Sequence, residues 1–212
     1  MGTIERRLRE RKNRIEEIIE SAKHIFRLKG FSNTSMHDIA TNSELSRRTL
    51  YLYFKSKDEL AVAVAAAGLE KLASDVDSVA GGGGNAFTRL NCILGLYLEL
   101  YHSDPSAFLM ILGFNESVRE IGIEHELTKR CYRAIGRICD SVARLLTEGS
   151  ADGSVRAFPA PNLSATTMIT LIHGILHTAV TNGDIIQGAT AIDSSALLDE
   201  AFELVTHYIE PN

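Results

Sequence analysis

The chain contains 212 residues, of which 45% are hydrophobic and 23% charged, and this composition is typical of a globular protein with a sizeable core. Its length allows one domain, or a small domain attached to a larger one. The three cysteines are odd in number and lack CxxC spacing, which disfavours both a disulfide framework and a zinc site. The first residues are charged where a secretory signal is apolar, and the longest apolar stretch, 168–180, is too short to span a bilayer. We therefore expect a cytoplasmic protein without a membrane segment.

Charge is distributed unevenly along the chain, although the formal net charge is −5. Residues 1–60 carry 13 Lys and Arg against 9 Asp and Glu, and the remaining residues carry 9 against 18. This asymmetry indicates an N-terminal part that meets a polyanion, followed by a part with another task. Alternatively, the basic residues at the start only solvate the end of a helix; they are Arg6, Arg7, Arg9, Arg11 and Lys12.

The N-terminal part has the periodicity of helices, with no strand-like alternation of useful length before the glycine run 81–84. Apolar residues spaced three and four apart predict a first helix from Ile15 that ends at Gly30. Thr34 or Ser35 is expected to cap a second helix of about two turns. That helix turns three apolar side chains inward: Met36, Ile39 and Ala40.

Two further N-terminal helices follow after polar breaks. Ser46 is expected to cap a third helix over 47–53. A fourth helix begins after Ser56, where Glu59 completes a capping box, and ends at the glycine run. The run itself is either a hinge or a surface loop.

Five more helices are predicted beyond the glycine run, near residues 86–101, 105–112, 116–147, 163–181 and 194–209. Pro105, after Asp104, suits a first helical position. The helix over 163–181 is apolar nearly all round, and the last helix has a wide apolar face, so both need more than one partner surface. We therefore expect an all-α fold of about nine helices and a homodimer formed through the last two.

Residues 31–60 resemble the DNA-binding segment of the TetR family of transcriptional regulators, whose pattern is roughly TxxxIAxxAGVSxxTLYxYFxSKxxL. Fourteen positions match, identically or by a similar residue: Ser35, Ile39, Ala40, Ser43, Leu45, Ser46, Thr49, Leu50, Tyr51, Tyr53, Phe54, Ser56, Lys57 and Leu60. The resemblance implies a three-helix helix-turn-helix DNA-binding domain over 1–56 and a helical ligand-binding and dimerisation domain over 57–212. Glu44 departs from the pattern because it replaces the turn glycine, which costs strain if the position needs a positive φ.

The resemblance and the chemistry of the side chains indicate the same DNA-contacting residues. The start of the second helix of a helix-turn-helix enters the major groove, where Arg47 and Arg48 can bond guanine and the Thr49 methyl can touch thymine. The family pattern also assigns DNA contacts to Tyr51 and His37, whereas phosphate contacts are expected from Tyr53, Lys57 and Thr34. The full predicted set is Thr34, Ser35, His37, Ser46, Arg47, Arg48, Thr49, Tyr51, Tyr53 and Lys57.

Each of these assignments has an alternative. Tyr51 and Tyr53 are also candidates for packing residues, and Arg48 and His37 for solvated surface residues. Arg7, Arg9 and Arg11 form either a minor-groove arm or a solvated helix extension, and the helix extension is favoured.

A ligand pocket is expected in the C-terminal part, at polar or soft residues on otherwise apolar helices. The predicted set is Tyr101, Phe114, Asn115, Tyr132, Met168, His173 and His177. His173 and His177 are four apart and could bind a metal, but buried hydrogen-bonded histidines or pocket donors are favoured. We expect no metal and no cofactor.

The resulting hypothesis is a repressor that a small, hydrophobic effector releases from a pseudo-palindromic operator in double-stranded DNA. An enzyme is disfavoured because the sequence lacks GxxxxGK, HExxH and GxSxG motifs and shows no catalytic residues. A helical ligand-binding or adaptor protein without operator binding is the alternative. An activator is equally compatible with the sequence, because the outcome depends on where the operator lies.

Overall fold

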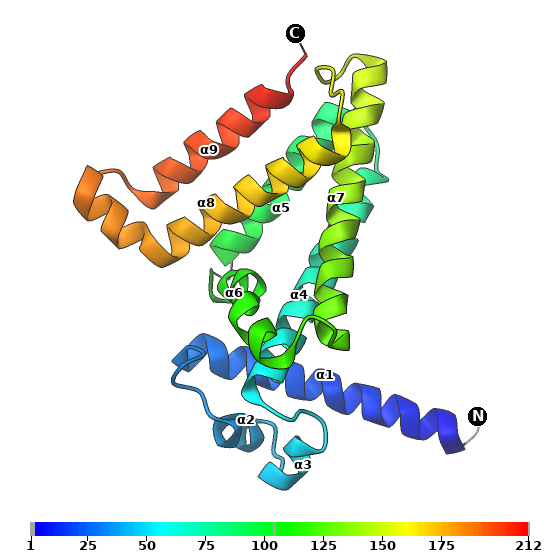
Figure 1. The fold of residues 1–212 in the computed structure, drawn as a ribbon, viewed down its shortest axis with the longest axis vertical. Helices are drawn as coiled ribbons and strands as arrows, with labels where there is room; N and C mark the ends of the chain where they lie inside the picture. Colours follow the sequence, from blue (N-terminus) through cyan, green and yellow to red (C-terminus); the bar gives the residue numbers. More distant parts are fainter. Residues whose placement is uncertain (1–2, 104, 212) are drawn as a thin grey trace.

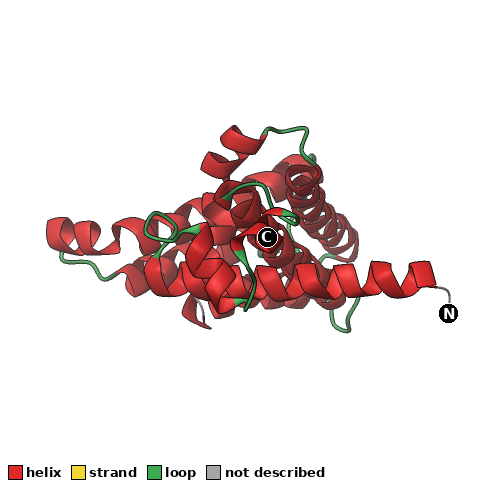
Figure 2. Cartoon of the chain, turned by 90° about the horizontal axis from the view of Figure 1, so that it is seen from below, coloured by secondary structure: helices red, strands yellow, loops and turns green. Residues whose placement is uncertain are grey.

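The computed structural model describes residues 3–103 and 105–211, and this part of the chain forms nine α-helices joined by loops. Their bounds are α1 Thr3–Lys29, α2 Met36–Asn42, α3 Arg47–Tyr51, α4 Lys57–Ala80, α5 Ala86–Ser103, α6 Pro105–Ile121, α7 Glu126–Asp152, α8 Pro161–Thr190 and α9 Ser194–Ile209. Figure 2 shows helices and connecting loops throughout the described residues. The prediction of an all-α fold of about nine helices is therefore confirmed. Pro105 begins α6 as expected, while Asp104 lies outside the described residues.

The helices form a head and a body (Figure 1). Helices α1 to α3 make the head, and α5 to α9 make the body, where α8 and α9 form a hairpin along one side. Helix α4 runs from the head into the body and packs against α6 and α7. The small residue Gly68 allows the close approach of α6, since an added Cβ would lie 2.8 Å from the Ile111 side chain.

Two hydrophobic cores meet on α4. Leu60, Ala63 and Val64 belong to the core of the head, which the apolar stripe of α1 completes. Val62 and Leu69 belong to the core of the body. Because opposite faces of one helix are buried in different cores, α4 joins the head to the body rigidly.

The predicted boundary between α6 and α7 was wrong. One helix was expected to end at residue 112 and the next to begin at 116, but α6 continues to Ile121 and α7 begins at Glu126. The apolar stripe of α6 runs on through Phe114 and Val118, both buried, so Gly113 does not interrupt the helix. The chain breaks instead at Gly122, whose φ of 93° only glycine adopts without strain.

Other helix ends also differ from prediction, since α1 begins at Thr3 instead of Ile15 and α7 continues past 147 to Asp152. Helix α3 ends at Tyr51, two residues early, and α8 extends nine residues beyond 181, to Thr190. The polar stretch around Gly183 does not stop α8, and Ser194 at the start of α9 lies 3.3 Å from the position of a Cβ at Gly183. The start of α9 thus packs closely against the part of α8 that extends beyond the predicted end.

Helix α8 is the one described helix long and apolar enough, by length and composition alone, to cross a membrane. The expectation that this segment is too short to span a bilayer rested on residues 168–180, whereas the helix has 30 residues. Met168, Ile172 and Leu176 on this helix are buried in the core of the body. One face of α8 therefore packs in the core of the body, while Leu163, Leu171 and Ile185 on this helix are exposed.

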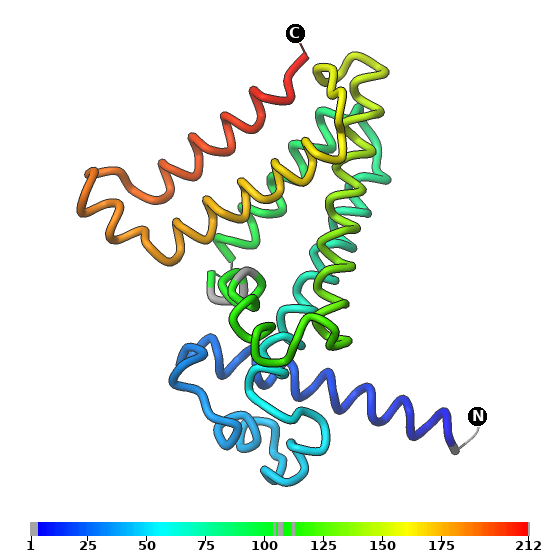
Figure 3. Tube along the Cα trace, viewed as in Figure 1, coloured from blue at the N-terminus to red at the C-terminus, as the bar shows by residue number. Residues whose placement is uncertain are grey.

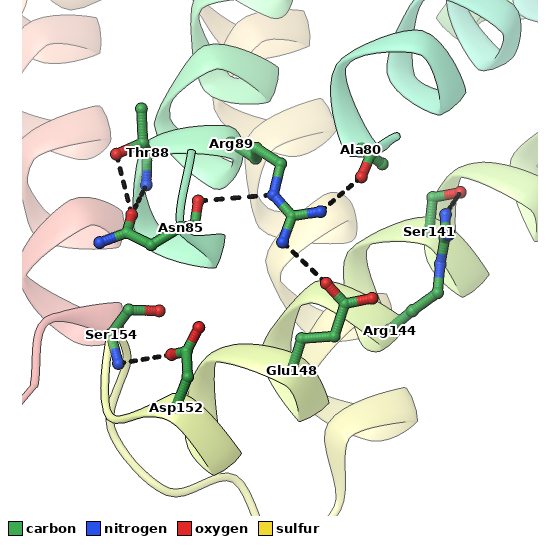
Figure 4. A network of polar contacts seen from close by, with 9 residues as sticks. All are labelled: Ala80, Asn85, Thr88, Arg89, Ser141, Arg144, Glu148, Asp152 and Ser154. Atoms are coloured by element: carbon green, nitrogen blue, oxygen red, sulfur yellow. Dashed lines mark hydrogen bonds and ion pairs between the residues drawn. The ribbon is translucent and has the colours of Figure 1, made fainter. Parts of the chain in front are cut away.

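The glycine run is fixed at both ends by polar contacts (Figure 4). Arg89 on α5 donates to the Ala80 carbonyl and to the Glu148 carboxylate on α7, both at 2.7 Å. The side chain of Asn85 accepts the backbone N–H of Thr88 at 2.9 Å and caps α5. These contacts tie the end of α4 to α5 and α7, which favours the interpretation of residues 81–84 as a surface loop.

The turn between α2 and α3 contains a non-glycine residue in the left-handed region. Glu44 has a φ of 53° and follows α2 in a Schellman motif. The Leu45 N–H donates to the Ala40 carbonyl at 2.8 Å, and the Glu44 N–H donates to the Thr41 carbonyl at 3.2 Å. The strain expected from the sequence is therefore present, and the turn keeps the geometry that glycine usually provides.

We expect Glu44→Gly to stabilise the protein. Relief of the left-handed conformation gains about 1–2 kcal/mol, and the flexibility of glycine in the unfolded chain offsets about half of this. Urea denaturation followed by circular dichroism should show a net gain of about 0.5–1 kcal/mol. Glu16→Gly, in the exposed middle of α1, is the control and should destabilise by about 1 kcal/mol. A loss of stability in Glu44→Gly would contradict the strain argument.

Candidate DNA-binding surface and ligand pocket

Helix α3 exposes charged side chains on one face and is anchored in the core of the head on the other. Leu50 is fully buried and anchors the helix in the core of the head. Arg47 and Arg48 at its start are exposed, as is Tyr51, with 45% of its surface accessible. Together with exposed His37 on α2, these side chains provide hydrogen-bond donors on a helix that is held in place from behind.

Three of the predicted DNA-contacting residues act first as structural hydrogen-bond partners. Ser35 caps α2, because its hydroxyl accepts the Asp38 N–H while the Asp38 carboxylate accepts the Ser35 N–H at 2.9 Å. Ser46 caps α3 by accepting the Thr49 N–H at 3.0 Å. Thr34 is buried, and its hydroxyl donates to the Gly30 carbonyl at 2.7 Å. These residues fix the start of the helices that carry the exposed donors.

A lysine near the end of α1 strengthens the cap of α2. Lys29 donates to the Asp38 carboxylate at 2.6 Å. This hydrogen bond, helped by those from Ser35, holds the pKa of Asp38 well below its usual range. Asp38 is therefore ionised at neutral pH and continues to accept both bonds.

Lys57 and Tyr53 also contact the head. The Lys57 ammonium donates to the Phe31 carbonyl at 2.8 Å and lies 4.3 Å from the centroid of the Phe31 ring. The guanidinium of Arg11 lies 5.1 Å from the centroid of the Tyr53 ring. Since an ammonium group has three donors, Lys57 can hold this loop and still reach a phosphate.

The basic residues at the start of the chain lie on a helix. Arg7, Arg9 and Arg11 are exposed on α1, which is continuous from Thr3. Figure 3 shows this end of α1 extending past the rest of the head. The structure thus matches the helix extension favoured from the sequence and contains no extended arm among residues 3–29.

A pocket of about 420 Å³ lies in the body between α4, α6, α7 and α8. Five predicted ligand residues line it, and five apolar or small residues that the sequence analysis missed complete it. The lining residues are Leu69, Ile111, Phe114, Asn115, Tyr132, Ile135, Thr170, His173, Gly174 and His177. Thr170 and Gly174 share the face of α8 that carries both histidines, so the helical spacing alone could have identified them.

Two predicted ligand residues lie elsewhere. Tyr101 is half-buried near the end of α5, beside His102, and is not part of the pocket lining. Met168 lines a separate cavity of about 10 Å³ among apolar residues of α5, α7, α8 and α9. That space is too small to hold a ligand.

His173 is a half-buried histidine whose buried ring nitrogen is unpaired. Its Nε2 has no hydrogen-bond partner, and its ring centroid lies 5.4 Å from that of Tyr97, whose buried hydroxyl also lacks a partner. Burial lowers the pKa of His173 to about 4 and raises the pKa of Tyr97. Both rings are therefore neutral at neutral pH. Among the described residues no cluster of three His, Cys, Asp or Glu side chains is placed to hold a metal.

Helix α6 connects the pocket to the start of α4. One turn beyond Phe114, the Ser117 hydroxyl donates to the Asp58 carboxylate in the first turn of α4 at 2.9 Å. In the loop after α6, His125 Nε2 lies 3.5 Å from the Glu59 carboxylate. The other carboxylate oxygen of Glu59 accepts the Lys55 N–H, close to the end of α3. A shift of α6 would therefore act directly on the segment that follows the exposed helix.

A second hollow of about 300 Å³ lies between α1, α4, α5 and α6. Its floor is apolar, but five charged residues contribute to its lining: Glu20, Lys23, Lys71, Asp75 and Glu99. Lys71 pairs with Asp75 at 2.6 Å. The remaining charges leave this hollow with a net negative lining.

The sequence of the head is similar to that of known bacterial regulatory proteins. Residues 18–64 match the family model described as bacterial regulatory proteins, tetR family. The HTH-type transcriptional regulator YfiR of Bacillus subtilis strain 168 is 42% identical over 55 residues. That alignment covers 26% of this chain and 27% of YfiR, so it spans about a quarter of the relative's length.

Solved structures share the whole fold. The transcriptional regulator FadR from Bacillus subtilis, in complex with stearoyl-CoA, is 18% identical with a TM-score of 0.66, and the match covers 92% of this chain and 99% of FadR. A TetR-family regulator from Agrobacterium tumefaciens is 14% identical with a TM-score of 0.72, over 94% and 99% of the two chains. At these identities the similarity establishes the fold.

The buried neutral imidazole predicts a pH-dependent stability. A histidine in the unfolded chain has a pKa of about 6.5, whereas His173 in the folded protein has a pKa of about 4. Between these two pH values the unfolded chain therefore binds more protons than the folded protein does. The stability that His173 contributes is complete above pH 6.5 and falls as the pH drops toward about 4, where the folded state also protonates. The loss is at most about 3 kcal/mol.

Urea denaturation of His173→Phe between pH 7 and pH 5 measures this contribution. We expect the variant to lose much of the pH dependence of the wild type. His24→Phe, at an exposed position on α1, is the matched control and should retain it. A variant as pH-dependent as the wild type would show that His173 is not the group responsible.

Proposed function

Because this chain belongs to the TetR family of bacterial regulatory proteins, we propose that it binds an operator sequence as a homodimer and that a small-molecule effector releases it. TetR-family regulators are DNA-binding transcriptional repressors with ligand-binding C-terminal domains, and they act as transcription factors, not as enzymes. The observation that carries the proposal is the matched segment itself. Within it, α3 is anchored by Leu50 and exposes Arg47 and Arg48.

The DNA contacts follow from the exposure of these side chains. Arg47 and Arg48 would read base edges in the major groove, with Thr49 and Tyr51 beside them. His37, Tyr53 and Lys57 would contact the backbone, and the caps formed by Thr34, Ser35 and Ser46 would fix the register. Such a protein acts where the DNA is, in the cytoplasm.

A dimer through α8 and α9 is supported by apolar residues exposed on these helices. Leu171 on α8 and Leu204 on α9 are each 61% exposed in the single chain. Both line a groove of about 390 Å³ between the two helices, together with Gly174, Thr178 and Val205. A second copy would cover this face, and two recognition helices would then meet a pseudo-palindromic site.

The pocket between α6, α7 and α8 is the proposed effector site. It is concave, largely apolar and connected to the head through the contact of Ser117 with Asp58. The stearoyl-CoA in the FadR structure makes a ligand with a long apolar chain one candidate. Release requires an effector that binds the non-DNA conformation about a hundredfold better, or roughly 2.7 kcal/mol.

The division into a DNA-binding domain over 1–56 and a ligand-binding and dimerisation domain over 57–212 is part of the proposal. The two hydrophobic cores support two units. Leu60 and Val64 in α4, however, belong to the core of the head. The first turns of α4 therefore fold with the DNA-binding unit, although the boundary places them beyond it.

Charge reversal on α3 tests operator binding against the adaptor alternative. We expect Arg47→Glu and Arg48→Glu each to weaken binding to a selected duplex at least tenfold, because a base-reading arginine contributes about 1–3 kcal/mol. Fluorescence anisotropy measures the affinity, and circular dichroism checks the fold. Arg133→Glu, on the exposed face of α7, is the control and should bind normally. Unchanged DNA affinity in both α3 variants would favour the adaptor.

The proposed dimer face is tested by Leu171→Glu. Since Leu171 is largely exposed, the single chain should still fold, but a buried charge at the interface should dissociate the dimer. Sedimentation velocity should show a dimer for the wild type and a monomer for the variant. Ile123→Glu, at a position 63% exposed in the loop after α6, should remain dimeric. A Leu171→Glu variant that stays dimeric would place the interface elsewhere.

A further inference from the structure

The pocket between α6, α7 and α8 is lined without any formally charged side chain. Among the described residues that form it there is no Asp, Glu, Lys or Arg. Its polar groups are an amide, two hydroxyls and two imidazoles, on Asn115, Tyr132, Thr170, His173 and His177. The lining therefore offers neutral hydrogen-bond partners within a largely apolar surface.

This lining selects against ions. Five of the ten lining residues are exposed, so one side of the pocket is open to water. Against Leu69, Ile111 and Phe114, however, a charged group loses hydration, and no opposite charge compensates for that loss. His173 does not supply a cation, because burial lowers its pKa to about 4 and leaves the imidazole neutral at neutral pH. A neutral hydroxyl, carbonyl or amide, in contrast, can bond the lining without that cost.

We propose that this pocket binds an uncharged molecule with a largely apolar body and one or two hydrogen-bonding groups. As a statement about the effector, it rests on the regulatory function proposed above. A volume of about 420 Å³ is within the range of small-molecule sites. His173 also contributes a buried Nε2 that has no hydrogen-bond partner. A ligand that forms a hydrogen bond with this atom would remove the cost of leaving it unpaired.

The second hollow does not offer a better site for an anion. Its Lys71 is already paired with Asp75, and its one other cation, Lys23, is outnumbered by Glu20 and Glu99. A phosphate or carboxylate there would meet more negative than positive charge. Neither hollow therefore has the cationic lining that an anionic effector, such as a CoA thioester, needs for its phosphates.

Three probes of nearly equal size and shape test the charge class of the ligand. They are 4-hexylphenol, which is neutral at pH 7, the carboxylate of 4-hexylbenzoic acid (hexylbenzoate below), which is an anion, and 4-hexylbenzylamine, which is a cation. Binding is measured on the full-length protein, without DNA, as the rise in unfolding temperature followed by circular dichroism. We expect hexylphenol to raise the unfolding temperature. The two charged probes should bind at least tenfold more weakly.

A charge introduced at the edge of the pocket locates the binding site. Asn115 is exposed, so Asn115→Arg leaves the core intact while it adds a cation to the lining. We expect this variant to bind hexylbenzoate more tightly than the wild type does, by tenfold or more, and to bind hexylphenol no better. Asn162→Arg makes the same change at an exposed position of α8 outside the pocket and should behave as the wild type.

The proposal is overturned if no shift occurs with hexylphenol up to its solubility limit, if the wild type prefers either charged probe, or if Asn115→Arg and Asn162→Arg respond alike. Operator binding is measured separately on the same preparation. Failure of the probes with intact operator binding would refute the ligand class and leave the regulator in place. Failure of operator binding with the expected probe pattern would refute the regulatory function and leave the pocket chemistry in place.

Discussion

Helix α4 is buried in the hydrophobic core of the head and in that of the body. Leu60 and Val64 pack in the head, and Val62 and Leu69 pack in the body, so the helix contributes to the stability of both. A close-packed interior does not deform continuously, which means that the head cannot turn relative to the body without moving α4. Helix α4 follows the exposed α3 after a short turn, and its body half lines the pocket at Leu69. The arrangement places the proposed DNA-binding surface and the proposed effector pocket on the same rigid element.

Helix α6 adds a second, weaker connection between these sites. It contributes Ile111, Phe114 and Asn115 to the pocket, and one turn later Ser117 bonds Asp58 at the start of α4. A hydrogen bond to a charged group is worth about 1.5–3 kcal/mol, and the partial exposure of Asp58 favours the lower end, below the roughly 2.7 kcal/mol that hundredfold release requires. Coupling therefore needs the packing of α6 on α4 to change together with this bond. A change in this packing would alter the close contact between Ile111 on α6 and Gly68 on α4.

The sequence predicted the all-α fold and the helices of the head well, because caps at Ser35, Ser46 and Ser56 are local signals. It failed at the break between α6 and α7, since Gly113 and Gly122 look alike until the burial of Phe114 and Val118 shows which one continues the stripe. The pocket was predicted only in part for a related reason. Spacing identifies residues on one face of one helix, such as His173 and His177, but does not show that Leu69 and Ile135 from two other helices face them. Glu44 shows the opposite case, in which a departure from the family pattern correctly indicated strain.

Selection of bound duplexes from a random pool by the purified protein, followed by a salt titration on the recovered sequence, shows whether α3 reads DNA. We expect an enriched pseudo-palindrome, because a dimer presents α3 twice with two-fold symmetry. We also expect an affinity that falls steeply with salt, since the arginines and lysines of the head displace counterions from the phosphates. Weak binding with no enriched sequence, by a protein shown to be folded and dimeric, would contradict the assignment of α3 as a recognition helix.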